Sequence, residues 1–525
     1  MLRLGWKELA LACMSAALLI PAMPRHDVGA LAWVGLAPLL VALDGKRPAS
    51  AFVLSYLSGL IFFHGVFSWI FVIGDFNVLD QILLAGYLSA YYGVFGTALA
   101  WIRRRTTLPM VLVAPPLWVA LEYLRAHASF LSLPWMLLGY SQHLHTSMIQ
   151  VTALTGVYGL AFLIVLTNAL LADLVRHWTR ARMASDGVVM VPRSLMIAAA
   201  VVALLLLGTY GYGRLVLSQP VSHERMRIGV VQGNVPQQQG VSRQTLLERY
   251  AGLTRQAAAA APALIVWPET AVPGDIKRDR ELQRAVSGLA TETARFLLVG
   301  ASQYAKLSNE RDPNQSLRDK WYNSMLLLSP DGRLVGEYRK IALIPFGEYE
   351  PLSGMVTWPK AITTGFGKLV PGEEHTLFSV DGRPFGAVIC WEIIFPDLFR
   401  QFVKAGASFM VNATNESWFG ATAVPHQLLA MAAIRSAENR VSIARAANTA
   451  LSAFVDPYGR VVERLRGAGG EEMFVEGVLV HDIVVSRAGT FYTRHGDVFA
   501  FAQIGLLAIL FVWSYMRCPR FRTGT

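Results

Sequence analysis

A series of long apolar stretches constrains this 525-residue chain more than any other feature. Several approach or exceed the ~20 residues that a helix needs to cross the hydrocarbon core of a bilayer. Because that core offers the backbone no hydrogen-bond partner, we expect each stretch to be helical. We predict eight spans, at 8–24, 28–43, 50–73, 79–102, 108–125, 150–175, 194–216 and 496–516. The span at 28–43 is short and contains Pro38.

The charge content supports a membrane protein. Charged residues make up 16% of the chain, well below the roughly 25% typical of soluble domains. The net charge of +11 could indicate nucleic-acid binding, but many of the basic residues lie at the ends of apolar spans. Basic residues at span ends set the orientation of a membrane protein. We therefore expect membrane lipids as partners and no nucleic acid.

Most basic residues between spans fall on one side of the membrane, and the other short loops offer only Arg25 and Arg125. Those on the first side are Arg3, Lys7, Lys46, Arg47, Arg103, Arg104, Arg105, Arg176, Arg180, Arg182, Arg193, Arg517, Arg520 and Arg522. The positive-inside rule assigns this side to the cytoplasm. The long segment after the seventh span is then expected outside the cytoplasm. We predict three parts: helices in 1–219, an external domain at 220–490, and a last helix and tail in 491–525.

The external segment differs in character, because short β-rich runs alternate with helical patterns. The predicted strands are Arg227–Val231, Ala263–Trp267, Phe296–Ala301, Ser324–Ser329, Phe385–Cys390, Ser408–Asn412, Val441–Ala446 and Leu451–Asp456. Helical patterns occupy 242–260, 278–294, 396–405 and 425–440. Strands interleaved with helices predict a layered α/β domain.

A single cysteine ends one of these predicted strands. Cys390 follows the run Gly386–Ile389 and is expected at a sharp turn. A thiol is a strong nucleophile when a neighbouring group removes its proton. Alternatively, Cys390 is an ordinary packed core cysteine. Cys13 and Cys518 lie in the first span and beyond the last, so we expect no disulfide framework.

Two charged residues upstream favour the nucleophile. Glu269 follows a predicted strand, and Lys340 closes a charged run that begins at Glu337. Taken singly, such charges are more often solvated or helix-capping. Together with a cysteine they supply a base, a cation that stabilises a thiolate and an oxyanion, and a nucleophile. Glutamate is a strong enough base only if burial raises its pKa.

Three motifs resemble those of the nitrilase, or carbon–nitrogen hydrolase, superfamily over about 225–485. They are Pro268-Glu269, then Lys340 with Pro345-Phe346-Gly347-Glu348, and then Cys390-Trp391-Glu392. The resemblance implies an αββα sandwich and a catalytic triad of Glu269, Lys340 and Cys390. It makes Glu348 an assisting glutamate and places Trp391 and Glu392 beside the nucleophile. Trp391 stands where the family often has tyrosine.

With spans on both sides of this domain, the whole chain resembles the membrane-embedded members of the superfamily that acylate lipoproteins in bacterial inner membranes. That resemblance implies a membrane phospholipid as acyl donor and a thioester on Cys390. It implies the α-amine of a lipoprotein's N-terminal diacylglyceryl-cysteine as acceptor. It further implies a periplasmic catalytic domain and no cofactor. Ping-pong kinetics would follow from the covalent intermediate.

Two segments have a composition suited to acyl chains. One holds Met355, Val356, Trp358, Ile362 and Phe366, and the other is Trp418-Phe419-Gly420. These residues would guide lipid and keep water from the thioester, or else are ordinary surface or core aromatics. The histidines show no metal-ligand spacing, so we expect no metal site.

Two other functions stay open from the sequence. A membrane-anchored amidase would share the triad but pass the acyl group to water. A transporter with an external binding domain would not need Cys390, but it predicts polar or broken spans, of which there are few. Within the spans, Glu122 is expected to pair with Arg125 or to face the interface, and 127–149 is expected to be re-entrant or interfacial.

Overall fold

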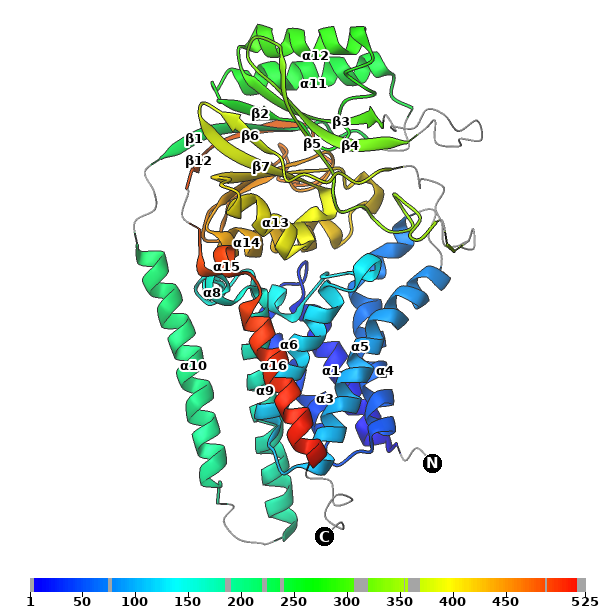
Figure 1. The fold of residues 1–525 in the computed structure, drawn as a ribbon, viewed down its shortest axis with the longest axis vertical. Coiled ribbons are helices and arrows are strands. Elements are labelled where there is room, and N and C mark those ends of the chain that lie inside the picture. The colour runs from blue at the N-terminus through cyan, green and yellow to red at the C-terminus, as the bar shows by residue number, and fades with distance from the viewer. Residues whose placement is uncertain are drawn as a thin grey trace. The chain divides into compact units, whose positions relative to one another are not determined.

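The chain folds into two compact units, Met1–Gln219 with His495–Thr525, and Pro220–Arg494. The structure, a computed structural model, describes residues 4–73, 78–184, 190–219, 224–236, 240–305, 320–353, 355–356, 369–486 and 489–516. Each unit is described by itself below, with the element labels of Figure 1.

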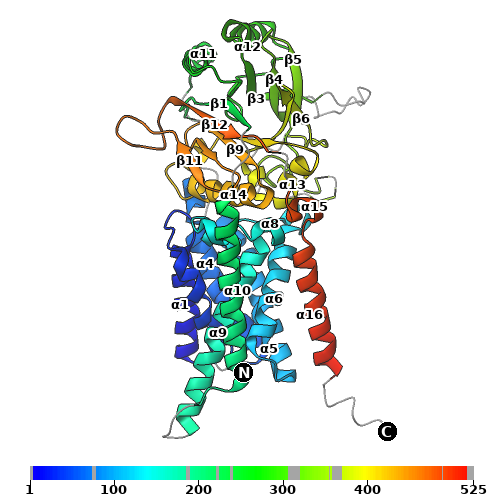
Figure 2. The same cartoon turned by 90° about the vertical axis from the view of Figure 1, so that its left-hand side faces the viewer.

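The first unit is helical, and its long helices run side by side (Figure 2). They are α1 (Trp6–Ala22), α2 (Ala32–Gly35), α3 (Ala37–Ala42), α4 (Pro48–Val66), α5 (Val78–Arg105), α6 (Met110–Ala126), α7 (Thr146–Ile149), α8 (Thr152–Thr155), α9 (Val157–Ala184), α10 (Arg193–Ser218) and α16 (Val498–Met516). Among the described residues, five of these are long and apolar enough to cross a membrane: α4, α5, α9, α10 and α16.

The predicted number of eight spans is thus not confirmed, although apolar helices are. Helices α1 and α6 have 17 residues each. Helices α10 and α16 bury only 11% and 17% of their most apolar windows, whereas α9 buries 78%. Apolar side chains that face outward on α10 and α16 are expected where helices contact lipid.

The predicted span at 28–43 is broken into short pieces, a 3-10 turn at Gly29–Leu31 followed by α2 and α3. The break leaves backbone N–H groups without helical partners. The fully buried Asn168 of α9 accepts hydrogen bonds from the N–H groups of Leu36 and Ala37, both at 2.8 Å. Its own amide donates to the Ala32 carbonyl at 2.9 Å. One side chain therefore satisfies the interrupted backbone.

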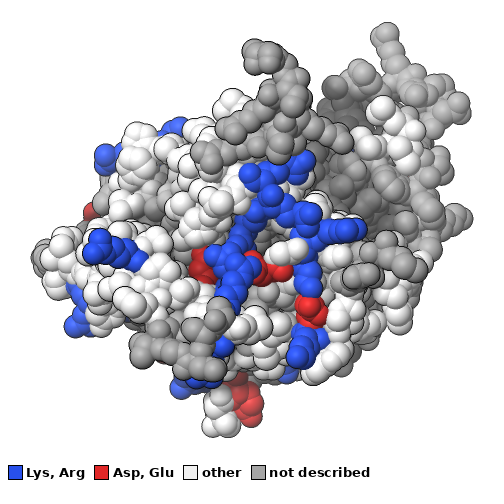
Figure 3. Space-filling view, turned by 90° about the horizontal axis from the view of Figure 1, so that it is seen from below, with Lys and Arg blue, Asp and Glu red and all other residues white. Residues whose placement is uncertain are grey.

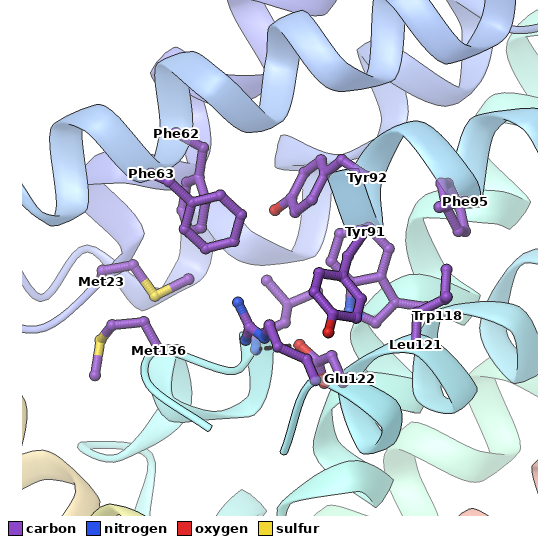
Figure 4. A pocket seen from close by; sticks show the side chains of 12 residues that line it. Met23, Phe62, Phe63, Tyr91, Tyr92, Phe95, Trp118, Leu121, Glu122 and Met136 are labelled. Carbon is purple, nitrogen blue, oxygen red and sulfur yellow. Dashed lines mark hydrogen bonds between the residues drawn. The ribbon is translucent and has the colours of Figure 1, made fainter. Parts of the chain in front are cut away.

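Glu122 lies in a pocket of the helical unit whose walls are largely aromatic (Figure 4). It is 7% exposed and accepts a hydrogen bond from the Leu138 N–H at 2.7 Å. Arg125 lies instead over the Phe63 ring, 5.3 Å from its centroid. The expected pairing of Glu122 with Arg125 is therefore wrong in its geometry, because Glu122 binds the backbone of the 127–149 segment.

The second unit contains two six-stranded sheets among its described residues, ordered β12-β1-β2-β3-β4-β5 and β11-β10-β9-β8-β7-β6. The strands are β1 (Arg225–Gln232), β2 (Leu264–Val266), β3 (Phe296–Tyr304), β4 (Trp321–Leu328), β5 (Leu334–Arg339), β6 (Leu377–Val380), β7 (Arg383–Ile389), β8 (Phe409–Thr414), β9 (Ser442–Ala447), β10 (Ala453–Val455), β11 (Val461–Arg464) and β12 (Gly477–Val484). The helices are α11 (Arg243–Ala258), α12 (Arg280–Thr293), α13 (Pro396–Lys404), α14 (Val424–Asn439) and α15 (Phe491–His495).

These elements form four layers, as Figure 1 shows for α11 and α12 outside one sheet and for α13 and α14 outside the other. Each helix presents an apolar face to its sheet, for example Leu282, Val286 and Leu289 of α12. Polar side chains cap the helices α11 and α12, namely Ser242 and Asp279. Asp279 caps α12 by accepting the N–H groups of Glu281 and Leu282 at 3.0 and 3.1 Å. The predicted αββα sandwich is confirmed.

The central strands of both sheets are parallel, which determines where the chain can carry a site. Strands β1, β2 and β3 run parallel in one sheet, and β7, β8 and β9 run parallel in the other. The carboxyl ends of parallel strands meet at one edge of a sheet, where loops leave the core. Glu269 follows β2 and Cys390 follows β7, so each lies at such an edge.

Candidate active site

Cys390 occupies the turn between β7 and a 3-10 helix at Cys390–Ile394. Its φ of +54° lies in the left-handed region, which costs a residue other than glycine about 1–3 kcal/mol unless the surroundings hold it. The buried Asn412 side chain provides that support, because it donates to the carbonyls of Val388 and Cys390, both at 3.3 Å. The turn therefore fixes the thiol at the strand tip, where the residue is 6% exposed.

Glu269 is held close to strand β3 by a glycine. Gly300 accepts the Val272 N–H at 2.9 Å. A Cβ added at Gly300 would lie 2.2 Å from the Pro268 carbonyl oxygen and 2.7 Å from the Glu269 Cα. No real Cβ tolerates such contacts, so glycine is required where the Glu269 segment crosses the strand.

We expect Gly300→Ala to lower turnover at this candidate site by about 100-fold, because displacing a candidate base by about 1 Å has that cost. The measurement is the initial rate of turnover by purified protein. Gly229→Ala in neighbouring β1 is the matched control, since its added Cβ would meet nothing closer than 3.5 Å. Equal rates for the two variants would contradict the packing argument.

The Glu269 carboxylate is buried and hydrogen-bonded at both oxygens. Oε1 accepts from the Asn323 side chain at 2.7 Å, and Oε2 accepts from the Asn415 backbone N–H at 2.8 Å. Burial raises the pKa of Glu269, with Lys340 opposing the shift and Glu348 adding to it. A glutamate with a raised pKa is a stronger base than one in water.

Lys340 follows β5 and is fully buried between two carboxylates. Its Nζ lies 2.6 Å from Glu348 Oε1 and 3.6 Å from Glu269 Oε1. Burial acts to lower the pKa of Lys340, but the charges of Glu348 and Glu269 outweigh it and hold this pKa above its ordinary value. Glu348 is itself fixed by the Ile344 N–H, which donates to Oε2 at 2.8 Å. Lys340 is therefore a fixed cation.

The Cys390 thiol lies within electrostatic range of both groups. Burial raises the pKa of this thiol, repulsion from Glu269 raises it further, and Lys340 and a hydrogen bond with Thr414 act against the shift. The thiol is therefore protonated near neutral pH. A base must remove its proton as it attacks, rather than beforehand.

Glu392 connects the lysine segment to the nucleophile turn. Its Oε1 accepts the N–H groups of Ile341 and Ala342 at 2.7 and 2.9 Å, and its Oε2 accepts the Ile389 N–H at 2.7 Å. The buried Tyr338 hydroxyl donates to both oxygens at 2.9 Å. This carboxylate thus aligns Lys340 with Cys390 through backbone bonds.

Trp391 reinforces the same junction. Its indole N–H donates to the Ala342 carbonyl at 2.6 Å, and its ring packs edge-on against Phe395. Trp391 is 7% exposed and Glu392 is fully buried. The two residues that follow Cys390 therefore both make their contacts within the protein.

We expect Glu392→Gln to destabilise the catalytic unit by about 2 kcal/mol, because an amide turns a donor toward backbone N–H groups. That loss corresponds to a thermal midpoint lower by roughly 5 °C. Differential scanning fluorimetry of the purified protein measures it. Exposed Glu374 provides the control Glu374→Gln, and matching midpoints for the two variants would contradict this role for Glu392.

Sequence reasoning missed several polar residues behind the triad. Asn323 and Asn415 hold Glu269, and Thr414 contacts the thiol. Behind Thr414, the fully buried Arg445 pairs with Glu416 and also donates to Asn412. The only sequence signal is that these polar residues lie within or close to predicted strands, and that signal does not identify what each one touches.

The predicted lipid-contacting segments are partly described. Met355 and Val356 are 85% and 39% exposed, and Trp418 is 37% exposed. Phe419 is partly buried. Trp358, Ile362 and Phe366 lie outside the described residues. Over the described residues, no group of three or more His, Cys, Asp or Glu side chains could hold a metal ion.

Comparison with known proteins assigns families to both parts of the chain. Residues 15–170 match the family described as the apolipoprotein N-acyltransferase N-terminal domain, and residues 227–492 match the carbon-nitrogen hydrolase family. The amidase from Nesterenkonia sp., a solved structure, matches 53% of this chain and 96% of its own, with 20% identity and a TM-score of 0.37.

Curated relatives match nearly the whole chain. The apolipoprotein N-acyltransferase of Geobacter metallireducens is 33% identical over 97% of this chain and 96% of its own. Those of Chlorobaculum tepidum and Pseudomonas aeruginosa are each 28% identical, over 95% and 98% of this chain and 94% and 96% of their own. The similarity therefore covers the helical and the hydrolase-like parts together.

Proposed function

The chain belongs to the apolipoprotein N-acyltransferase family, and from this we propose that Glu269, Lys340 and Cys390 carry its acyl transfer. The protein is an acyltransferase that N-acylates lipoproteins, which sets aside the amidase alternative. The proposal extends to its substrates. The acyl donor is a membrane phospholipid, and the acceptor is the α-amine of an N-terminal diacylglyceryl-cysteine.

The first half-reaction loads the enzyme. Glu269 takes the thiol proton while the Cys390 sulfur bonds to the ester carbonyl carbon of the phospholipid. Lys340 and the Trp391 backbone N–H stabilise the negative oxygen of the tetrahedral intermediate. The ester C–O bond then breaks, and Glu269 returns the proton to the departing oxygen. A lysophospholipid leaves and a thioester remains.

The second half-reaction transfers the acyl chain. The neutral α-amine of the lipoprotein attacks the thioester carbonyl, and Glu269 removes a proton from the nitrogen. An α-amine has a pKa near ~8, so an appreciable fraction is neutral at physiological pH. The C–S bond breaks, an amide forms, and Glu269 returns a proton to the sulfur. The enzyme is regenerated for a second donor.

One observation carries the proposal: a fully buried lysine, 3.6 Å from one carboxylate and 2.6 Å from another, interacts electrostatically with the buried cysteine. A buried charge requires compensation by nearby opposite charge. The two carboxylates that compensate Lys340 include Glu269, so a candidate base, a cation and a thiol interact with one another, which supports the proposal. Such an assembly is typical of catalytic sites, in which burial and charge shift pKa values together.

The proposal is tested by incubating purified protein with a phospholipid of defined acyl chain in detergent. Intact-protein mass spectrometry should show a mass increase equal to that acyl group, mapped to the Cys390 peptide. Addition of a synthetic diacylglyceryl-lipopeptide should remove the adduct and yield the N-acylated lipopeptide. Absence of any adduct on the Cys390 peptide would overturn the mechanism.

The membrane setting follows from the substrates. Lifting an acyl chain from a bilayer into water costs about 0.8 kcal/mol per CH₂ group, so a site reached from the lipid surface is favoured. We place the chain in the bacterial inner membrane with its catalytic unit on the periplasmic side, as the distribution of Lys and Arg between spans predicts. The proposal also assigns eight membrane spans. They are the five long helices, α1, α6 and the 28–43 region.

We expect Trp418→Ala combined with Phe419→Ala to increase hydrolysis of the thioester relative to transfer by about tenfold. Trp418 is exposed and Phe419 partly buried beside it, so their removal would let water reach the thioester. The measurement is the ratio of free fatty acid to acylated lipopeptide. An unchanged ratio would reject the role, and exposed Val462 provides the control Val462→Ala.

A further inference from the structure

A polar hollow of about 250 Å³ lies at one end of the helical unit, lined only by residues of that unit. The loop at 43–46, the end of α5, the loop at 106–108 and helix α9 surround it. Figure 3 shows the molecule from this side, with Lys and Arg gathered around acidic residues. The hollow is large enough for a headgroup rather than for isolated water molecules.

The charge of this hollow is unbalanced. Its walls carry five basic residues and a single acidic one, namely Lys46, Arg103, Arg104, Arg176 and Arg180 against Asp44. Two acidic residues that do not line the hollow, Glu8 and Asp173, form ion pairs with two of the basic residues. Glu8 lies 2.6 Å from the Lys46 Nζ, and Asp173 lies 3.5 Å from Arg176. Five positive charges against three negative ones leave an excess of +2.

Asp44 holds the arginines in place without neutralising them. Its carboxylate lies 3.3 Å from Arg103, 3.6 Å from Arg176 and 2.7 Å from Arg180. The Arg103 Nε is buried and has no hydrogen-bond partner in the part of the chain that the structure describes. Arg104 is exposed and forms no ion pair with any described residue. Donor groups therefore remain for an anion.

The walls also have an apolar side. Leu43, Leu99 and Leu108 line the same hollow, next to the basic groups. Helices α5 and α9, which supply the arginines, are both long and apolar enough to cross a membrane. A phosphate beside a hydrocarbon chain matches this combination, whereas a free inorganic anion would not use the leucines.

We propose that this hollow binds the phosphate headgroup of an anionic membrane phospholipid. Basic pockets between membrane helices recognise such headgroups, and each Lys or Arg near an anionic surface contributes about 1 kcal/mol. The site is separate from the residues of acyl transfer. The bound lipid would bridge α5, α9 and the 43–46 loop, and so stabilise this end of the helical unit.

The test uses the purified full chain in detergent, titrated with phosphatidylglycerol or with phosphatidylcholine, and read out by native mass spectrometry. We expect retention of phosphatidylglycerol over phosphatidylcholine. Arg104→Gln should weaken phosphatidylglycerol binding about fivefold. Arg105→Gln is the matched control. Arg105 lies at the same end of α5, but it does not line the hollow. Its guanidinium carbon lies 4.1 Å from the centroid of the Trp101 ring.

Three results would overturn the proposal. Equal retention of the two lipids would remove the anionic preference. Equal losses in Arg104→Gln and Arg105→Gln would indicate diffuse surface charge instead of a site. Displacement of the lipid by glycerol phosphate at equal concentration would identify a site for soluble phosphates. Arg180→Gln offers a second variant, and it should weaken binding in the same direction because Arg180 also lines the hollow.

Discussion

Replacing Cys390 with alanine is expected to abolish the thioester and to lower acyl transfer by at least about 10⁴-fold, the scale of losses seen when a covalent nucleophile is removed. Among the described residues, Cys390 is the only cysteine of the second unit, because Cys13 belongs to the helical unit. No other described thiol of that unit can replace it. The two measurements are the acyl adduct by intact-protein mass spectrometry and the rate of lipopeptide acylation.

Cys13→Ala is the matched control for this prediction, since it makes the same chemical change in α1 and should leave both measurements unchanged. Circular dichroism and the thermal midpoint of Cys390→Ala should equal those of the parent protein. Lipopeptide acylation by a folded Cys390→Ala protein at a tenth of the parent rate would contradict nucleophilic catalysis by this residue.

Replacing Glu269 with glutamine is expected to lower acyl transfer by about 10³-fold, within the range that general acid–base catalysis contributes. The same change should make Cys390 more reactive toward iodoacetamide. The Glu269 charge helps raise the pKa of the thiol, so its removal increases the thiolate fraction at a given pH. Transfer and alkylation should thus move in opposite directions.

Peptide mapping after timed alkylation measures the reactivity of Cys390 separately from the other cysteines. Glu337→Gln is the control, because this carboxylate lies three residues before Lys340 and pairs with Lys277 and Arg339 instead. A parallel loss of transfer and of alkylation in Glu269→Gln would show that the site had collapsed, and the role of base would have to be abandoned.

The sequence predicted the catalytic unit better than it predicted the helical unit. All eight predicted strands overlap strands of the structure, because largely buried strands read as short apolar runs between turn residues. The four strands that were missed, β5, β6, β11 and β12, are partly exposed, and all but β6 carry charges, such as Glu337, Glu463 and Asp482. Their pairing is decided by neighbouring strands, which local patterns do not contain.

Apolar length alone was a weaker guide in the helical unit. The stretch at 28–43 looked like one continuous helix, but its helix is interrupted, and Asn168, more than 120 residues away, accepts the backbone N–H groups at the break. Likewise, three residues far apart in sequence indicated the triad, yet the partners that fix it, Asn323 and Glu392, bind atoms of segments that follow other strands. Contacts of this kind follow from the folded topology and not from spacing.

The backbone bonds of Glu392 have a consequence for anyone who would move this chemistry to another scaffold. A designed protein that copied only Cys390, Lys340 and Glu269 would lack the hydrogen bonds that join the segment after Lys340 to the turn at Cys390. Those bonds are made by Glu392 and not by the three copied side chains. The minimal portable unit therefore includes a fourth residue, the buried Glu392 carboxylate, together with Tyr338, whose hydroxyl donates to both of its oxygens.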